Sequence, residues 1–250
     1  MKTIAIANRK GGVGKSTTAS ALSAGLQKKG YRVLTIDLDA QRNLSTTLKA
    51  KTDAKTVLGV ITGEITAKEA IQHMENGDVI AASKGLSGAD LIITETGKEY
   101  RLKEALESVS DIYDFCIIDC PPALNILTIN ALVAADGVLI PAQADLYSLE
   151  GIKDLSEVMQ PVIKYCNANL KIYGILLTRY SSRSVLSKDA TTLAKRLAEQ
   201  LKTIVFTTTI REAVAVKEAQ ISQKSLFDYA PNANVTMDYK IFIDEFLQRI

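Results

Sequence analysis

The sequence has 250 residues, of which 47% are hydrophobic and 23% are charged, and its formal net charge is +2. This composition excludes a largely disordered chain, and so small a charge does not by itself indicate a nucleic-acid-binding protein. No apolar run approaches the roughly 18 to 20 residues of a membrane-spanning helix and no signal region precedes the first predicted strand, so we expect one cytoplasmic domain spanning residues 1–250.

The hydrophobic pattern predicts an α/β protein. Short β-branched runs alternate with segments of helical length, which is typical of a doubly wound, mostly parallel sheet with helices on both faces. The predicted strands are residues 3–8, 32–37, 79–82, 115–119, 137–141, 172–177 and 203–206. The predicted helices are residues 15–29, 99–108, 126–135, 149–165, 187–201 and 235–248. Short helices and loops are expected in 44–75 and 83–98.

A glycine-rich segment follows the first predicted strand and leads directly into a helix. In such a loop the backbone N–H groups and the helix N-terminus bind phosphate oxygens. Lys15 would reach the β- and γ-phosphates, and Ser16 would ligate Mg²⁺. The order of strand, loop and helix therefore predicts a P-loop, called the phosphate loop below. Its residues are Lys10, Gly11, Gly12, Val13, Gly14, Lys15, Ser16 and Thr17.

Carboxylates follow two other predicted strands. The second strand ends at Asp37, and Asp39 comes two residues later. Carboxylates at this edge of a sheet lie where nucleotide chemistry happens, and one near the γ-phosphate can orient or deprotonate the attacking water. The buried strand at 115–119 delivers Asp119 at its end, which is typical of a Walker B strand that holds Mg²⁺, often through water.

The phosphate loop resembles the deviant Walker A motif of the ParA/MinD family of partitioning and positioning ATPases, Lys-Gly-Gly-x-Gly-Lys-Ser/Thr. Asp119 begins Asp-Cys-Pro-Pro, which is similar to the family's Asp-x-Pro-Pro. Ala40 and Arg42 depart from the family, which usually has proline at the first position and commonly glycine at the second. The compact, Soj-like members are the nearest match. Further similar segments, at 127–132, 141–143, 149–151, 176–180 and 229–231, extend the resemblance over nearly the whole chain.

The resemblance implies an ATP hydrolase that uses Mg²⁺, turns over slowly and dimerises when ATP binds. Lys10 would reach across the dimer interface to the phosphates of the other subunit, and Asp39 would hold the attacking water. With Lys15, these two are the candidate catalytic residues. Ser16 and Asp119 would hold the metal, Asp119 through water. The resemblance also assigns three candidate adenine contacts: Thr178, Arg179 and Arg211.

Basic residues gather in residues 171–224, called the basic segment below. Ten lysines and arginines there outnumber four acidic residues, for a net charge of +6. Sequence-independent DNA binding needs only phosphate neutralisation by such side chains. ParA-type members bind DNA in this way as ATP-bound dimers on the nucleoid, until a centromere-bound, ParB-like adaptor stimulates hydrolysis. The resemblance places Arg183 and Lys217 at DNA contacts, with Lys217 in a loop, although Ala215 replaces a nearby family arginine.

MinD-like members instead reach a membrane through a basic, amphipathic C-terminal helix. Residues 238–250 hold three acidic and two basic residues, and their apolar spacing is typical of a helix that packs on its own domain. We therefore expect no membrane partner. The alternative function is a MinD-like or cargo-positioning ATPase acting on a membrane or a protein assembly.

Three other classes fit the sequence less well. An electron-transfer protein like the nitrogenase iron protein needs cluster-ligating cysteines, and Cys116 and Cys120 lack such spacing. We interpret them, together with Cys166, as reduced thiols. Nothing indicates the carboxylate-substrate pocket of a ligase related to dethiobiotin synthetase. The chain end offers only Tyr229 and Tyr239, not the tyrosine cluster of a bacterial tyrosine kinase.

Overall fold

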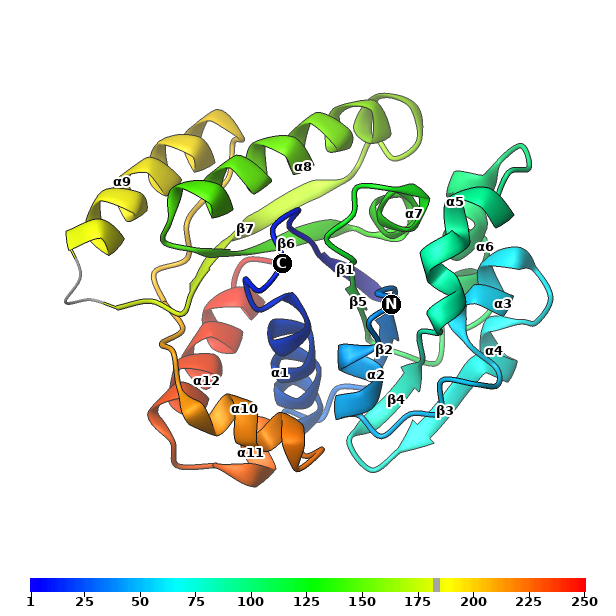
Figure 1. Cartoon of the computed structure of the whole chain (residues 1–250), viewed down its shortest axis with the longest axis horizontal. Helices are drawn as coiled ribbons and strands as arrows, with labels where there is room; N and C mark the ends of the chain where they lie inside the picture. The colour runs from blue at the N-terminus through cyan, green and yellow to red at the C-terminus, as the bar shows by residue number, and fades with distance from the viewer. Residues whose placement is uncertain (182–184) are drawn as a thin grey trace.

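A computed structural model describes residues 1–181 and 185–250 of the chain (Figure 1). Within these residues, seven strands form one sheet in the order β3-β4-β2-β5-β1-β6-β7. Neighbouring strands are parallel, except β3 and β4, which are antiparallel. The strands are β1 (Lys2–Ile6), β2 (Val33–Asp37), β3 (Ile71–Met74), β4 (Gly77–Ile80), β5 (Phe115–Asp119), β6 (Gly137–Gln143) and β7 (Lys171–Thr178).

The central strands are buried on both faces. Every residue of β2 and of β5 is buried. Along β5, Phe115 and Ile117 belong to one hydrophobic cluster, whereas Cys116 and Ile118 belong to the other. Because successive side chains of a strand point to opposite faces, such a continuous apolar run requires helices on both sides of the sheet.

One face of the sheet is covered mainly by α1 and α12, with three shorter helices beside them. These five helices are α1 (Lys15–Lys28), α2 (Asn43–Thr47), α10 (Val214–Ile221), α11 (Leu226–Tyr229) and α12 (Asn234–Leu247). Gly25 allows α1 and α12 to pack closely, because a Cβ at this position would lie 2.1 Å from Cδ1 of Ile243.

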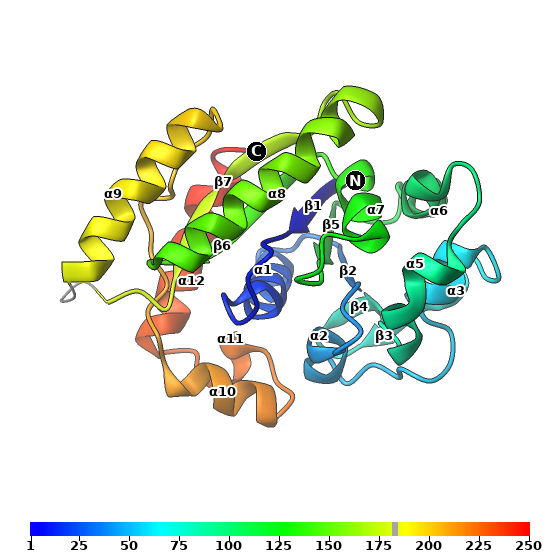
Figure 2. The ribbon, with the colours of Figure 1, turned by 45° about the horizontal axis from the view of Figure 1, so that its top comes forward.

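The other face is covered by helices from the middle of the chain. They are α3 (Val57–Thr62), α4 (Ala67–Ala70), α5 (Ala89–Ile92), α6 (Arg101–Glu107), α7 (Ile126–Ala134), α8 (Leu146–Tyr165) and α9 (Val185–Gln200), with the 3-10 helices η1 (Lys84–Gly88) and η2 (Lys98–Tyr100). Figure 2 shows α9 running beside α8 at the β7 edge of the sheet. The predicted doubly wound α/β fold is therefore confirmed.

The predicted strand at 203–206 is wrong. Only an isolated bridge joins Val205 to Ile175 of β7. Two backbone hydrogen bonds of 2.9 Å form there, and the chain next pairs with β7 at Ile210, whose N–H donates to the carbonyl of Leu177 at 2.8 Å. The β-branched composition of 203–206 therefore indicated a segment that lies beside β7 but does not form a strand of the sheet.

The expectation of short helices and loops in 44–75 is wrong at β3, which is a strand, and α10 and α11 lack a sequence prediction. Strand β3 lies at the sheet edge, none of its residues is fully buried, and polar Gln72 and His73 interrupt its apolar pattern. In α10 only Ala219 is buried, so the helix has too short an apolar face to be recognised from its spacing.

The C-terminal helix α12 packs its apolar side on the domain, as predicted. Tyr239, Phe242, Ile243 and Phe246 are each at most 1% exposed. Phe206 meets Phe242 edge to face, with ring centroids 5.1 Å apart. Among the helices that the structure describes, none has both the length and the apolarity for a bilayer crossing.

Candidate nucleotide-binding site

Three loops meet at one edge of the sheet because β1, β5 and β2 are parallel neighbours. The strand register pairs Ile6 of β1 and Asp37 of β2 with Asp119 of β5, so the three strands end level with one another. The phosphate loop follows β1, and Asp39 follows β2. In open α/β sheets the crevice outside this edge is where ligands bind.

The phosphate loop has a backbone that favours glycine. Gly12 and Gly14 have φ angles of 76° and 86°, in the left-handed region that side chains disfavour. A Cβ added at Gly12 would meet no atom within 4 Å, so the loop borders open space. From outside, Thr178 Oγ1 donates to the carbonyl of Val13 at 2.8 Å, and Gln143 Nε2 donates to that of Gly12 at 3.0 Å. The loop is held in shape while its inner side stays accessible.

Lys15 starts α1 and is only 7% exposed. Its Nζ donates to the carbonyl oxygen of Lys10 at 3.1 Å. Burial lowers the pKa of Lys15, and the negative charge of Asp119 is the main effect that opposes this shift. A bound phosphate group would compensate the buried ammonium in the same way.

Asp119 has the features of a metal-binding carboxylate. It is fully buried, and neither oxygen has a hydrogen-bond partner of good geometry among the described residues. Burial and the nearby Asp37 raise its pKa well above the usual range, while the side chains of Ser16 and Lys15 oppose the rise. A buried carboxylate with unused lone pairs is costly unless it is neutralised, and a cation would do this.

The donor set fits Mg²⁺ rather than a metal with an all-protein cage. The described residues contain no group of three or more histidines, cysteines or carboxylates arranged to hold a metal ion. Mg²⁺ commonly takes one or two protein oxygens and completes its shell with phosphate oxygens and waters. Ser16 and Asp119 together offer such a partial set.

Asp37 supports the loop after β2 and does not line the cavity that contains Lys15 and Ser16. Its Oδ2 accepts hydrogen bonds from the backbone N–H and the hydroxyl of Ser45, at 2.8 and 2.7 Å. Its Oδ1 accepts from the backbone N–H of Asp39 at 3.0 Å. Burial raises the pKa of Asp37 to about 6 despite these bonds. Asp39 itself lies in the wall of the cavity that also contains Lys15 and Ser16.

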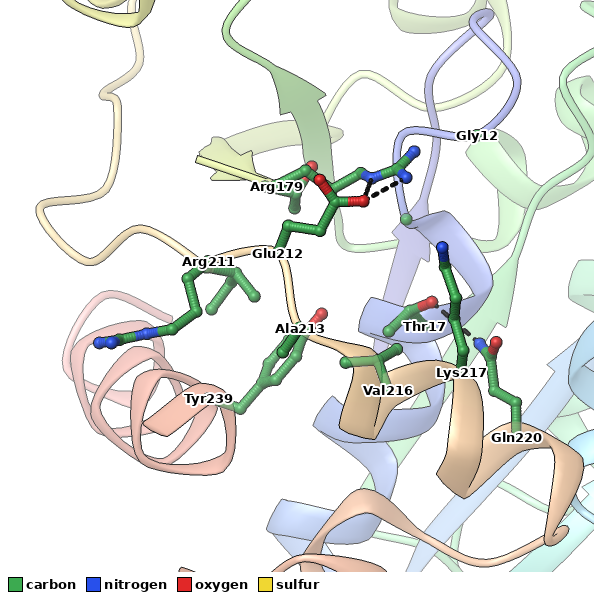
Figure 3. Close-up of a pocket in the computed structure, with 13 residues that line it drawn as sticks. Gly12, Thr17, Arg179, Arg211, Glu212, Ala213, Val216, Lys217, Gln220 and Tyr239 are labelled. Carbon is green, nitrogen blue, oxygen red and sulfur yellow. Dashed lines mark hydrogen bonds and ion pairs between the residues drawn. The ribbon is translucent and has the colours of Figure 1, made fainter. Parts of the chain in front are cut away.

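A second cavity adjoins the first on the far side of Gly12, Gly14 and Thr17 (Figure 3). The three predicted adenine contacts, Thr178, Arg179 and Arg211, all contribute to its wall. Figure 3 shows that the guanidinium of Arg211 points away from this cavity, toward α12. There it binds both carboxylate oxygens of Asp238, at 2.7 and 2.8 Å.

The side chain of Lys10 does not line the cavity that contains Lys15, Ser16 and Asp39, which is called the phosphate cavity below. Its Nζ binds Asp145 Oδ1 at 2.7 Å and Oδ2 at 2.8 Å. Asp145 is also the N-cap of α8, where it accepts from the backbone N–H of Ser148 at 2.9 Å. The exposed side chains of Leu146 and Tyr147 follow directly. Lys10 therefore lies at an exposed rim of the site.

The chain is similar to known proteins over most of its length. Residues 1–172 match the family described as AAA domain. The chain is 40% identical to the sporulation initiation inhibitor protein Soj of Bacillus subtilis over 93% of this chain and 92% of that protein. It is 39% identical to the chromosome partitioning protein ParA of Caulobacter vibrioides over 92% of this chain and 87% of that protein.

The chain belongs to the ParA/MinD family of P-loop ATPases. Solved structures of the same fold agree. The complex of a Cyanothece McdA variant with ATP has a TM-score of 0.87 at 29% identity, covering 100% of this chain and 97% of that one. Cobyrinic acid a,c-diamide synthase from Mycobacterium smegmatis with bound ADP and magnesium has a TM-score of 0.85 at 30% identity, covering 99% and 94%.

The structure describes one of the two residues that were predicted to bind DNA in this ParA/MinD protein. Arg183 lies outside the described residues. Lys217 was predicted in a loop, and this is wrong, because it lies within α10. The side chain contributes to the wall of the cavity that adjoins Gly12 and Gly14.

Sequence reasoning missed several site residues of this ParA/MinD protein. Gln220 Nε2 donates to Thr17 Oγ1 at 3.1 Å, which ties α10 to the first turn of α1. Glu212 binds Arg179, and Asp145 binds Lys10. These contacts join residues more than 30 positions apart, and no local motif marks them. Only Asp145, as an N-cap before a helical pattern, carries a signal that sequence could have supplied.

Proposed function

We propose that the protein is an ATP-dependent partitioning ATPase that uses Mg²⁺ and switches between a monomer and an ATP-bound dimer. The supporting observation is the phosphate loop, in which buried Lys15 lies close to unpartnered Asp119 while Lys10 points away from the phosphate cavity. Relatives named chromosome partitioning protein ParA support the cellular role.

Each residue of the phosphate cavity has a distinct part in the proposed reaction. The amides of the phosphate loop and Lys15 would hold the β- and γ-phosphates. Ser16 and, through water, Asp119 would hold Mg²⁺. When bound, Mg²⁺ neutralises the charge that develops on the phosphate oxygens. Asp39 would orient the attacking water, since it is the carboxylate of the β2 loop in the cavity wall.

Lys10 would complete the partner's site in the dimer. In the monomer its charge is neutralised by Asp145 at the rim, and its own phosphate cavity lacks it. Catalysis of phosphoryl transfer depends on positioning and on charge neutralisation. A monomer should therefore hydrolyse ATP slowly, and a ParB-like adaptor would act by completing or tightening the paired site.

The switch is tested by two variants that separate nucleotide binding from hydrolysis. Lys15→Ala should stay monomeric with saturating ATP, because the buried charge that holds the phosphates is gone. Asp39→Ala should dimerise with ATP but hydrolyse it at least about 100-fold more slowly. Light scattering measures dimerisation, and phosphate release measures hydrolysis. The control is Lys28→Ala, because Lys28 lies in α1 with Lys15 but is exposed. A monomeric Asp39→Ala protein would contradict the proposal.

Non-specific DNA binding by the ATP-bound dimer is the second part of the proposal. The basic segment supports it, and exposed Lys195 and Arg196 of α9 and Lys202 after it offer charges at the surface. Arg179 and Arg211 contribute less, since each is paired with a carboxylate. Binding would place the protein on the nucleoid. Arg183→Glu should abolish retention on duplex DNA with ATP, and unchanged retention with unchanged salt dependence would refute this contact.

The alternative is a MinD-like or cargo-positioning ATPase. A membrane role would need an accessible amphipathic surface, whereas the apolar side of α12 is used in packing on the domain. We therefore propose no membrane partner. Sedimentation with anionic liposomes and ATP separates the two functions, because a partitioning ATPase would stay in the supernatant.

A further inference from the structure

Helix α10 places Lys217 at the nucleotide site. Val216, Lys217 and Gln220 belong to the wall of the cavity that adjoins Gly12 and Thr17. Gln220 and Lys217 are three residues apart, so they lie on the same side of the helix. The hydrogen bond from Gln220 to Thr17 fixes this side of α10 against the phosphate loop. Figure 3 shows the ammonium of Lys217 turned toward the loop at Gly12.

Lys217 differs from the other basic residues of this cavity wall, each of which forms an ion pair. Arg179 Nη2 binds Glu212 Oε1 at 2.6 Å, and Arg211 Nε binds Asp238 Oδ2 at 2.7 Å. Lys217 has no ion-pair partner among the described residues. The charge of Lys217 acts on Glu212 of the same wall without a direct ion pair. Three basic residues but one acidic residue line the cavity, which suits an anionic ligand.

The position of Lys217 between the two cavities indicates which part of a bound nucleotide its ammonium would contact. The phosphate cavity and the second cavity share Gly12, Gly14, Thr17 and Gln220 in their walls. A nucleotide whose β- and γ-phosphates lie at Lys15 and whose base lies in the second cavity must carry its α-phosphate past this junction. Lys217 belongs to the wall of the second cavity only, next to the residues that the two cavities share.

We propose that Lys217 binds the α-phosphate of the nucleotide and does not contact DNA. This inference rests on the proposed function for nucleotide binding, and it replaces the DNA contact that the sequence suggests for this residue. A charge-assisted hydrogen bond to a phosphate is a binding contribution that neutral side chains on α10 cannot supply.

The test compares nucleotides with and without the α-phosphate. Lys217→Ala should weaken ADP binding about tenfold and leave adenosine binding unchanged, because one charge-assisted hydrogen bond is lost. Lys217→Arg should stay within about twofold of the unaltered protein for ADP, since it keeps the charge. Competition against a fluorescent ADP analogue, with Mg²⁺ present, gives the affinities. Lys224→Ala is the matched control, because Lys224 is exposed and does not contribute to the cavity wall.

The outcomes separate this inference from the proposed function. Failure of the unaltered protein to bind ADP would refute the nucleotide site itself. Normal ADP binding by Lys217→Ala would overturn the inference alone, as would equal weakening of ADP and adenosine. Retention of Lys217→Ala on duplex DNA at saturating ATP should match the unaltered protein. Lost retention with unchanged ADP affinity would instead assign Lys217 to DNA.

Discussion

The two ends of the nucleotide site are built in different ways. At the phosphate end, Lys15 and Asp119 are 7% and 0% exposed and lie where adjacent strands of one sheet end. The other end is the second cavity, where we propose that the base binds, and is called the base end below. There Glu212 and Lys217 are exposed and come from a loop and a short helix outside the sheet. The phosphate end is fixed by backbone pairing. At the base end, backbone pairing holds Thr178 and Ile210, whereas α10 is held by side-chain contacts.

This difference suggests which end can adjust during the ATP cycle. A parallel ladder of hydrogen bonds leaves the strand ends little freedom relative to one another. By contrast, α10 contacts Thr17 through Gln220 and Tyr229 through Glu218. In the turn after α10, Gln223 Nε2 donates to the carbonyl of Thr46 at 2.9 Å. Thr46 belongs to α2, which follows Asp39 in the chain. Movement of α10 can therefore reach the loop that carries Asp39.

The largest effect is expected at the phosphate end, from Asp119→Ala. Hydrolysis with Mg²⁺ should fall at least about 100-fold, because the buried carboxylate that holds the metal is lost. The nucleotide-free protein should become more stable by about 1 kcal/mol, since an unpartnered buried polar group is removed. Phosphate release and urea unfolding measure the two effects.

Asp114→Ala is the matched control for this variant. Asp114 lies at the opposite end of β5 and forms an ion pair at the surface with Arg32, with atoms 2.7 Å apart. Hydrolysis should change little in this variant. Its stability should fall and not rise, because the Asp114 carboxylate also accepts hydrogen bonds from Nε and the backbone N–H of Arg32. Loss of stability in Asp119→Ala together with normal hydrolysis would mean that Asp119 has a structural role only.

A smaller effect is expected at the rim between the two ends, from Asp145→Asn. The change removes the ion pair with Lys10 but keeps an N-cap for α8. In the proposed dimer Lys10 must break its ion pair with Asp145 to reach the partner's phosphates, and this variant removes that cost. The protein concentration for half-maximal ATP-dependent dimerisation should therefore fall about fivefold. Analytical ultracentrifugation measures this midpoint.

Asp154→Asn serves as the control. Asp154 lies in α8, the helix that Asp145 caps, and the change removes its ion pair with Arg9 but leaves the pair of Lys10 intact. Its dimerisation midpoint should not move. Weaker dimerisation of Asp145→Asn would show that Asp145 helps to form the dimer and does not restrain Lys10.

The smallest effect is expected from Gln220→Ala at the base end. Loss of one neutral hydrogen bond, to Thr17, should weaken ADP binding about two- to threefold. Gln223→Ala, which removes the contact with Thr46 and does not alter the cavity wall, should leave ADP affinity unchanged. Isothermal titration calorimetry resolves both. A hundredfold loss in Gln220→Ala would mean that the base end is as rigidly specified as the phosphate end.

Sequence reasoning predicted the strand, loop and helix of the phosphate end, because these residues form short, contiguous motifs beside buried strands. The α/β fold, most strands and the family were predicted from these patterns. The predictions failed where packing is weak. Residues 203–206 have strand-like composition but make a single bridge, and α10 buries only Ala219. Local propensity is a poor guide where few contacts reinforce it.

The sequence alone determined the phosphate loop, the family and the three strands that end beside the loop, because contiguous residues and buried apolar runs set these features locally. Tertiary structure decided where the long side chains point. Lys10 meets Asp145 across 135 positions of the chain, and Gln220 meets Thr17 across 203. Such pairs depend on how strands and helices are packed, and no local pattern records that packing.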